Sequence, residues 1–484
     1  MSDRPPFWKG LWSYVRGAVE TVEPVPGQRI RLSGKGIRIP FQGYPFEIQM
    51  GEQLLHLYPE PLFGDRHSRD VGNFVLYDPD RYLDGIGHFL RLRSGEKLSI
   101  THGIRHQRQV FSHPREAFRR YLQVSHEGDH LVFRDPISEL GTYLSLITDQ
   151  SDVDRLVRRR HQALDRLRKI FDNQFGLLPP EEALALLSEV NRLSHGDPYR
   201  RKDSEGHPGA LVELPDDITP ILLGDLHAQV DNLLTALTEN GYLESLEMGT
   251  AALIFLGDAV HPEHPDKLAF MDSSLQIMDL ILRLKRRFPS QVFLVVGNHD
   301  SFNHDVMKRH VAQGALWEQR VVELRGQRYR DELARFYRQS PLVSMSRDFV
   351  ACHAAPARGK PSREQLVDAW RSPQLVRDLT EGRINSPAFP AGYTGRDVRR
   401  FLSALGLPAN HTFIVGHYPR SRDETVWLDV GKIEGHHVLY SARDDRVGVL
   451  TSIDGVIVPQ VYPREPLLDI LREAGTTRAA LVAN

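Results

Sequence analysis

The chain has 484 residues, which is too long for one ordinary hydrophobic core, so we expect two or three domains. Its composition, 40% hydrophobic and 26% charged, is typical of a soluble globular protein. Lys and Arg number 61 against 63 Asp and Glu, and this balance argues against a protein that binds nucleic acid or an anionic membrane in bulk. Cys352 is the single cysteine, which excludes an intramolecular disulfide and fits a reducing compartment.

The first residues, "MSDRPPFWKGLWSYVRGAVETV", are interrupted by Pro, Lys, Gly and Arg and lack the apolar core of a signal peptide. No apolar run approaches the length that a membrane span needs. We therefore expect a cytoplasmic protein with neither a membrane nor a nucleic acid as its partner.

Four regions follow one another along the chain. Residues 1–150 alternate short β-like runs with turns, as in "KLSI" and "HLVFRD", which favours an all-β sandwich domain. Residues 151–206 predict a helical linker, because apolar residues recur at helical spacing in "SDVDRLVRRRHQALDRLRKIF" and in "PPEEALALLSEVNRL". Residues 207–465 alternate apolar runs with amphipathic segments, the pattern of an α/β domain, and residues 466–484 are predicted to form a helical tail.

Five apolar runs of the α/β region end in side chains that can bind metal. In open α/β sheets ligands gather at the carboxyl ends of the strands, and a preceding Gly lets the chain turn tightly there. We call the residues that directly follow such a run a strand exit. One strand exit by itself is usually a turn, but five within the same region favour a shared site. The residues at these exits are Asp225 and His227, Asp258, Asn298 with His299 and Asp300, His353, and His417.

The donors at these exits are oxygen and imidazole nitrogen, without a thiolate. This set suits a hydrolytic centre with Mn as the favoured metal and Fe or Zn as alternatives. Six ligands are too many for one catalytic ion that keeps a water, and they suit two divalent ions that share a carboxylate.

The motifs "GDLHAQ", "GDAVH", "GNHD", the histidine of "FVACHAAP" and "GHYP" resemble, in this order, those of calcineurin-like metallophosphoesterases. More narrowly, they resemble the phosphoprotein phosphatase branch over residues of about 207 to 462. The resemblance implies an α+β sandwich of central β-sheets flanked by helices. It also implies that Asp225 and His227 bind one metal, that Asp258 bridges both, and that His299 is the general acid. In the same family pattern the second metal is completed by Asn298, His353 and His417.

Two positions depart from that family. After the bridging Asp it has a second Asp, which orients the catalytic histidine, and then an Arg, which grips phosphate, whereas this chain has His261 and Pro262. We interpret Asp300 as the substitute partner of His299. Four arginines in segments expected near the site are candidates for the phosphate contact: Arg383, Arg396, Arg420 and Arg443.

Residues 119–146 resemble the second half of a forkhead-associated (FHA) domain. The resemblance implies that Arg119, Ser138 and Thr142 bind a phosphothreonine peptide. Leu140 stands where that family has the Asn that contacts the peptide, so a generic β-sandwich without this function is the alternative.

Together these motifs predict a bimetal phosphoesterase that hydrolyses phosphomonoesters, with a serine/threonine protein phosphatase as the first interpretation. Its substrate would be a phosphorylated protein or a small phosphoester. Hydrolysis of nucleotides or dinucleoside polyphosphates, or a phosphodiesterase activity, is the first alternative. A phosphopeptide-binding scaffold with a degenerate catalytic domain is the second.

Overall fold

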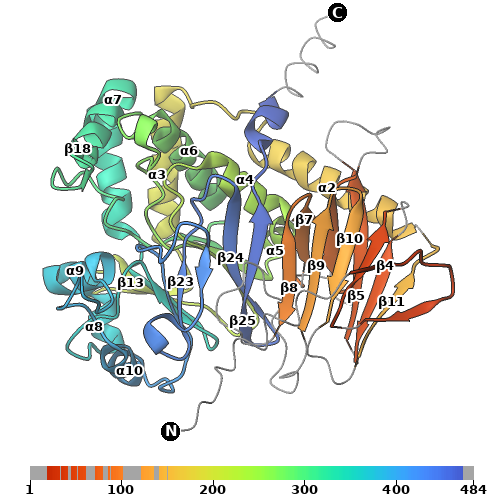
Figure 1. Ribbon diagram of the computed structural model, residues 1–484. Coiled ribbons are helices and arrows are strands. Elements are labelled where there is room, and N and C mark those ends of the chain that lie inside the picture. The colour runs from red at the N-terminus through yellow and green to blue at the C-terminus, as the bar shows by residue number, and fades with distance from the viewer. Residues whose placement is uncertain are drawn as a thin grey trace, which may run out of the picture. The chain divides into compact units, whose positions relative to one another are not determined.

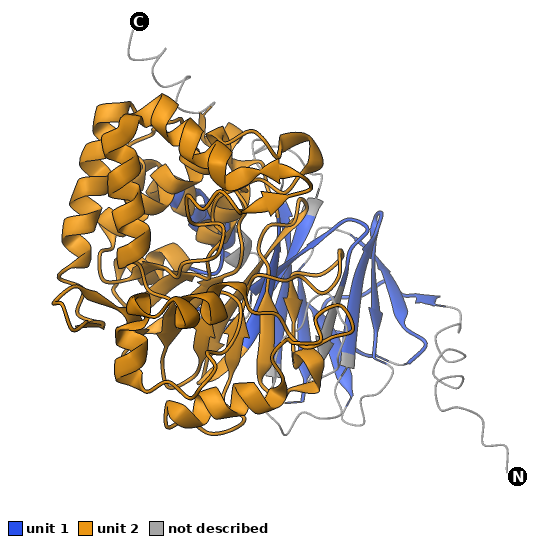
Figure 2. Cartoon of the chain, turned by 90° about the vertical axis from the view of Figure 1, so that its left-hand side faces the viewer, with its two compact units in different colours: residues 1–162, 239–241, 458–463 blue, residues 163–238, 242–457, 464–484 orange. Residues whose placement is uncertain are grey.

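The computed structural model describes residues 19–472, apart from residues 33, 42–44, 52, 62–70, 80–85, 88, 102–120, 136–140 and 150. The chain forms two compact units (Figure 2). Unit 1 contains residues 1–162, 239–241 and 458–463, and unit 2 contains residues 163–238, 242–457 and 464–484.

Unit 1 is a β-sandwich, as its alternating pattern predicts. One sheet has the strand order β1-β3-β10-β9-β8 and the other β2-β11-β4-β5-β6-β7. Alternate side chains of both sheets, such as Ile39, Ile48 and Leu131, are fully buried in one common core. The strands are β1 (Glu20–Thr21), β2 (Arg29–Arg31), β3 (Ile37–Pro40), β4 (Phe46–Met50), β5 (Gln53–Pro61), β6 (Val71–Tyr77), β7 (Phe89–Arg93), β8 (Lys97–Thr101), β9 (Tyr121–Glu127), β10 (His130–Arg134) and β11 (Thr142–Leu146).

The residues of the FHA-like motif are only partly described. Arg119 and Ser138 lie outside the described residues. Thr142 begins β11, where its residue is 2% exposed and its carbonyl accepts a hydrogen bond from the Leu32 amide. The Thr142 side chain is therefore part of the sandwich interior.

Two helices form where the 3.6-residue periodicity places them: α2 (Ser151–Ile170) and α3 (Pro180–Ser194). Pro180 occupies the first turn of α3, where its missing N–H costs no hydrogen bond, and two acidic residues follow it. The buried face of α3 packs against α6 (Asp272–Arg287) and α7 (Gln313–Gln339). By these contacts α3 is an integral part of unit 2.

Unit 2 contains two β-sheets that share a core, with helices outside (Figure 1). The first sheet has the order β12-β13-β19-β20-β21-β23-β22, and the second has β16-β15-β14-β24 followed by β25, whose residues 458–463 group with unit 1. The strands are β12 (Arg200–Lys202), β13 (Pro208–Glu213), β14 (Thr219–Leu223), β15 (Ala251–Phe255), β16 (Val292–Leu294), β19 (Val343–Met345), β20 (Val350–Cys352), β21 (Phe413–Val415), β22 (Val426–Trp427), β23 (His436–Leu439), β24 (Arg446–Ile453) and β25 (Val456–Pro463).

The direction of these strands brings the five exits together. In the second sheet β14, β15 and β16 are parallel neighbours, and in the first sheet β20 and β21 are parallel neighbours. Side chains of both sheets, such as Leu222, Ile254 and Ala351, are fully buried between them. The fold class predicted from the sequence is thereby confirmed, an α/β unit with sheets flanked by helices and an all-β sandwich unit.

The remaining helices cover the outer faces of the two sheets. A hydrophobic cluster that includes Leu366, Leu379 and Phe401 joins α8, α9 and α10 to the first sheet. No helix among the described residues is long and apolar enough to cross a membrane. The bounds not given above are α4 (Val230–Thr238), α5 (Tyr242–Glu247), α8 (Arg363–Val367), α9 (Pro373–Glu381) and α10 (Gly395–Ala404), with a hairpin of β17 (Met307–Lys308) and β18 (Val311–Ala312).

Candidate metal centre

Asp225 and His227 lie in the loop that follows β14, and both are buried. The Asp225 Oδ1 atom accepts a hydrogen bond of 2.8 Å from the backbone N–H of His417. His227 Nδ1 lies 3.1 Å from the carbonyl oxygen of His261, which turns its Nε2 atom toward Asp225 Oδ2 at 3.8 Å. His227 adopts a φ of 43°, a conformation that is costly for a non-glycine residue and is held here by its neighbours.

Asp258 follows β15 and also has a left-handed backbone, with a φ of 50°. Its Oδ1 atom accepts a hydrogen bond of 2.8 Å from the His299 amide, and its Oδ2 atom lies 3.3 Å from His353 Nε2. The glycine before it is required, because a Cβ at Gly257 would lie 2.6 Å from the Gly297 nitrogen and 2.7 Å from His353 Nδ1. Close approach of these loops therefore places Asp258 between residues from both sheets.

His353, His417 and Asn298 form the other side of the centre. His353 Nδ1 lies 2.7 Å from the Leu256 carbonyl oxygen, so this nitrogen carries the proton and Nε2 is left to face the site. The Nε2 atom lies 3.2 Å from Asn298 Oδ1 and 3.1 Å from His417 Nδ1. These three side chains come from the ends of β20, β16 and β21.

Five of the six predicted ligands come together in two overlapping clusters, and the sixth, Asn298, lies beside His353. Asp225, His227 and Asp258 form one, Asp258, His353 and His417 form the other, and in each the candidate ligand atoms lie within 4.8 Å of one another. Asp258 belongs to both, which fits a carboxylate that bridges two ions. In the described part of the chain, Asp225 Oδ2 and His417 Nε2 are buried without a hydrogen-bond partner, as atoms that face a metal would be.

The shifted pKa values of Asp225 and His353 indicate that added positive charge would stabilise the two clusters. Burial raises the pKa of the Asp225 carboxyl to about 7, and the charge of Asp258 adds to this rise. Burial lowers the pKa of His353, but the carboxylates of Asp258 and Asp225 outweigh that effect and raise it to about 9. A divalent cation would supply the charge that these buried carboxylates lack.

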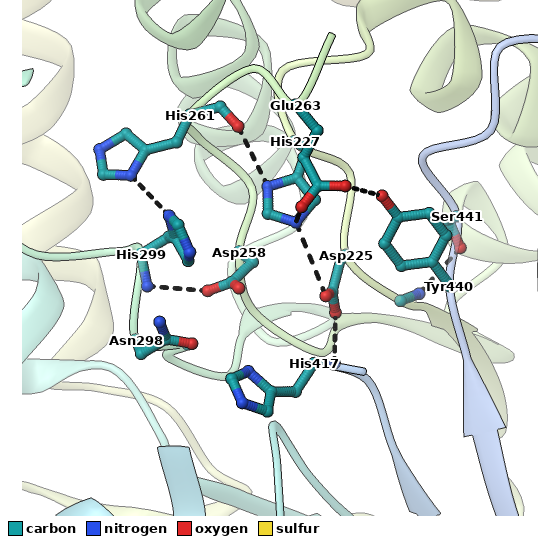
Figure 3. Close-up of polar contacts among 12 residues, drawn as sticks. Asp225, His227, Asp258, His261, Glu263, Asn298, His299, His417, Tyr440 and Ser441 are labelled. Atoms are coloured by element: carbon teal, nitrogen blue, oxygen red, sulfur yellow. Dashed lines mark hydrogen bonds and ion pairs between the residues drawn. The ribbon is translucent and has the colours of Figure 1, made fainter. Parts of the chain in front are cut away.

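The partner of His299 is His261. Their Nδ1 atoms lie 2.8 Å apart, and His261 is fully buried (Figure 3). The Asp300 carboxylate, which the sequence suggests as this partner, instead accepts hydrogen bonds from three backbone amides. The donors are Asp258 N at 2.8 Å, Gly297 N at 3.0 Å and Ala259 N at 3.1 Å. Asp300 therefore holds two of the site loops together, and the interpretation of Asp300 as the partner of His299 gives way to His261.

Two charged residues of the site were missed by the sequence analysis. Glu263 Oε1 lies 3.2 Å from His227 Nε2 and forms an ion pair with Lys308, and Glu263 Oε2 accepts a hydrogen bond from the Tyr440 hydroxyl. Glu263 stands five residues after Asp258 in the same loop, so its proximity to that strand exit was the available signal. Lys308 belongs to the β17–β18 hairpin and follows no core strand, so no sequence pattern marked it.

A cavity of about 1330 Å³ opens onto the centre. Of the four arginines named above, Arg383 lines it, and its guanidinium lies over the rings of Phe389 and Tyr418 at 4.8 and 4.6 Å. The guanidinium of Arg443 instead donates to the carbonyl oxygens of Glu424 and Ser421. Arg396 and Arg420 are exposed and are not among the lining residues.

The comparison with protein families agrees with this geometry. The family model described as Calcineurin-like phosphoesterase matches residues 218–435, which include all six candidate ligands. One solved structure that is similar is described as a protein serine/threonine phosphatase from Saccharomyces cerevisiae with similarity to human phosphatase PP5. It is 17% identical, its match covers 59% of this chain and 90% of that chain, and the TM-score is 0.44. No curated protein sequence matches the chain.

The family match and the two clusters define the class of the protein, a metal-dependent phosphoric ester hydrolase. More narrowly, residues 218–435 match the family model described as Calcineurin-like phosphoesterase. The enzyme class predicted from the strand exits is confirmed at this level.

Proposed function

We propose that the chain hydrolyses phosphomonoesters, as a serine/threonine protein phosphatase with two divalent metal ions, Mn in first place and Fe or Zn as alternatives. The observation that carries the proposal is the pair of clusters sharing Asp258 at the floor of the cavity, with His299 beside them. When bound, two such ions lower the pKa of a water molecule and neutralise charge on the phosphoryl oxygens.

The protein's own groups then have separable tasks. The Nδ1 atom of His299 is engaged by His261, so its Nε2 atom is the one left to give a proton to the leaving oxygen. Arg383 and Lys308 are cations on the cavity wall that can contact the anionic phosphate. Arg383 takes first place among the four arginines because the other three do not line the cavity.

The substrate class is tested by comparing the turnover of three kinds of phosphoester. Turnover with Mn²⁺ is measured for a phosphothreonine peptide, a bis-phosphodiester and a dinucleoside polyphosphate. The proposal expects the peptide to have the highest kcat/KM. Turnover of the dinucleoside polyphosphate without turnover of the peptide would favour the nucleotide hydrolase instead.

The scaffold alternative is tested without substrate. Two tight metal equivalents per chain in purified protein support the enzyme, because a hydrolytic centre of this kind needs both ions. One equivalent or none would favour a degenerate catalytic domain. Five of the six candidate ligands gather in the two clusters and Asn298 lies next to His353, which supports the enzyme.

The amino-terminal sandwich enters the proposal as an FHA-like module that brings phosphorylated proteins to the enzyme. Its support is the sequence motif that includes Arg119 and Ser138, together with the two-sheet sandwich that the described residues of unit 1 form. This role is tested by measuring the binding of a labelled phosphothreonine peptide to the full chain that carries Asp258→Asn, a change that is expected to abolish hydrolysis. Addition of Arg119→Ala to this variant is expected to remove the binding. Equal binding with and without Arg119→Ala would refute the module's role.

A further inference from the structure

Glu263 places a third carboxylate beside the cluster of Asp225, His227 and Asp258. It belongs to the loop after β15 but reaches back to His227, and Figure 3 shows its carboxylate beside the His227 ring and joined to Tyr440. The side chain of Glu263 is 29% exposed, so it lies at the edge of the cavity rather than on the protein surface.

The orientation of the His227 ring decides what the space between these two residues can hold. His227 Nδ1 faces the carbonyl oxygen of His261, which can only accept a hydrogen bond, so Nδ1 carries the proton in the neutral ring. The Nε2 atom then carries a lone pair and no proton, and Glu263 Oε1 lies 3.2 Å from it. In that tautomer the two acceptors repel at this distance unless a proton or a metal cation lies between them or beside both.

The distance itself suits two ligands of one ion. Carboxylate and imidazole ligands bind such ions at about 2.0–2.2 Å, so ligand atoms at adjacent positions of an octahedral ion lie about 3 Å apart. The Oδ2 atom of Asp225 is 3.8 Å from the same His227 Nε2, is buried, and has no hydrogen-bond partner among the described residues. This unpartnered oxygen is a second, independent sign that an ion belongs at this point.

We propose that Glu263 is an additional ligand of the ion bound by Asp225, His227 and Asp258. The proposal rests on the metal centre proposed above. Lys308 and Tyr440 hold the Glu263 side chain in place through its two oxygens. A third carboxylate makes this half of the centre richer in oxygen than the half formed by His353 and His417, and carboxylate oxygens suit Mn²⁺ and Mg²⁺. The cluster with Glu263 is therefore the site that selects the harder ion.

Calorimetric titration of metal-free protein with Mn²⁺, without substrate, tests the proposal. The wild type is expected to bind two equivalents. Glu263→Gln is expected to weaken one of them at least tenfold and to leave the other unchanged. Glu381→Gln is the matched control, because Glu381 lines the same cavity and is exposed, and it is expected to bind Mn²⁺ as the wild type does.

Lys308→Met separates a metal ligand from a simple counterion. If Glu263 binds the ion, removal of the lysine leaves two equivalents with Mn²⁺ affinity equal to or tighter than that of the wild type. If Glu263 only neutralises Lys308, Glu263→Gln binds both equivalents with wild-type affinity, and the proposal is overturned while the metal centre stands. A wild type that binds no Mn²⁺ would refute the metal centre itself.

Discussion

The Nδ1 atoms of His261 and His299 lie 2.8 Å apart in the interior of unit 2. A hydrogen bond between two imidazole nitrogens uses one proton, so one ring donates and the other accepts. A carboxylate at the place of His261 would stabilise the charged form of His299, whereas a neutral imidazole orients the ring without adding negative charge. Burial lowers the pKa of His299 to about 4, because the carboxylate of Asp258 opposes this effect only in part and Lys308 adds to it.

His261→Ala is expected to lower kcat by about 10- to 100-fold and to leave KM nearly unchanged, because the proton donor loses its orientation. The loss should be larger for phenyl phosphate than for 4-nitrophenyl phosphate, since the poorer leaving group depends more on protonation. His264→Ala, an exposed side chain in the same loop, serves as the control. Equal losses for both substrates would argue that His261 is only a packing residue.

Asp258→Asn is expected to abolish hydrolysis, with kcat reduced more than about 1000-fold, because the amide removes the charge shared by both clusters. Metal analysis of the same variant should show that at least one equivalent is lost. Asp266→Asn, an exposed residue eight positions later, should match the wild type in both assays. Activity retained in Asp258→Asn would mean that the clusters are assigned wrongly.

Asp300→Ala is expected to lower the free energy of unfolding of the metal-free protein by about 3–5 kcal/mol. The reason is that three buried backbone amides lose their acceptor at once. Urea denaturation followed by circular dichroism measures the change, and Asp305→Ala, an exposed residue of the cavity wall, is the control. Normal stability combined with lost turnover would return Asp300 to a catalytic role.

Chelation should remove activity and lower the melting temperature together, since it leaves the buried carboxylates of Asp225 and Asp258 with only the neighbouring histidines, chiefly His353, to offset their charge. Added Mn²⁺ at about 100 times its Kd should restore about 2.7 kcal/mol of stability per site. Thermal denaturation with and without Mn²⁺ measures the effect. Asp258→Asn should show little stabilisation by Mn²⁺, and a full response in that variant would place the metal elsewhere.

The stability of unit 1 should depend on a buried carboxylate that is independent of the metal centre. Burial would raise the pKa of Glu60, but the guanidinium groups of Arg160 and Arg91, with bonds of 3.0 and 2.7 Å, lower it to about 2. Because the pKa is depressed on folding, this stabilisation is complete above the ordinary pKa of 4.5 and is lost as the pH falls toward 2. This contribution of the Glu60 carboxylate to the free energy of unfolding is about 3 kcal/mol.

Glu60→Gln should remove that dependence and destabilise the protein by about 3–5 kcal/mol, because the buried guanidinium groups of Arg160 and Arg91 lose the carboxylate that they share, although Arg91 keeps its ion pair with Glu239. Urea denaturation at pH 7, 4 and 3 makes the comparison. Glu127→Gln, whose side chain is 43% exposed, is the control and should unfold as the wild type does at each pH. If the stability of the wild type and Glu60→Gln falls in parallel between pH 4 and 3, another group is responsible.

The sequence alone determined the features that depend on periodicity and local chain order. Alternating apolar residues predicted the sandwich, helical spacing predicted α3, and buried strands ending in Gly-Asp or Gly-Asn predicted the place of Asp225, Asp258 and Asn298. Parallel strands end at the same edge of a sheet, so the residues at their ends meet without further information.

Only the tertiary structure decided which side chains touch within the site. Asp258 and His261 both have a positive φ, and these turns send His261 toward His299 and Glu263 back toward His227. Asp300, adjacent to His299 in sequence, points away from its ring and binds backbone amides instead. Side-chain direction in a strained loop is set by neighbours that are distant in the chain, and for that reason no sequence pattern contained it.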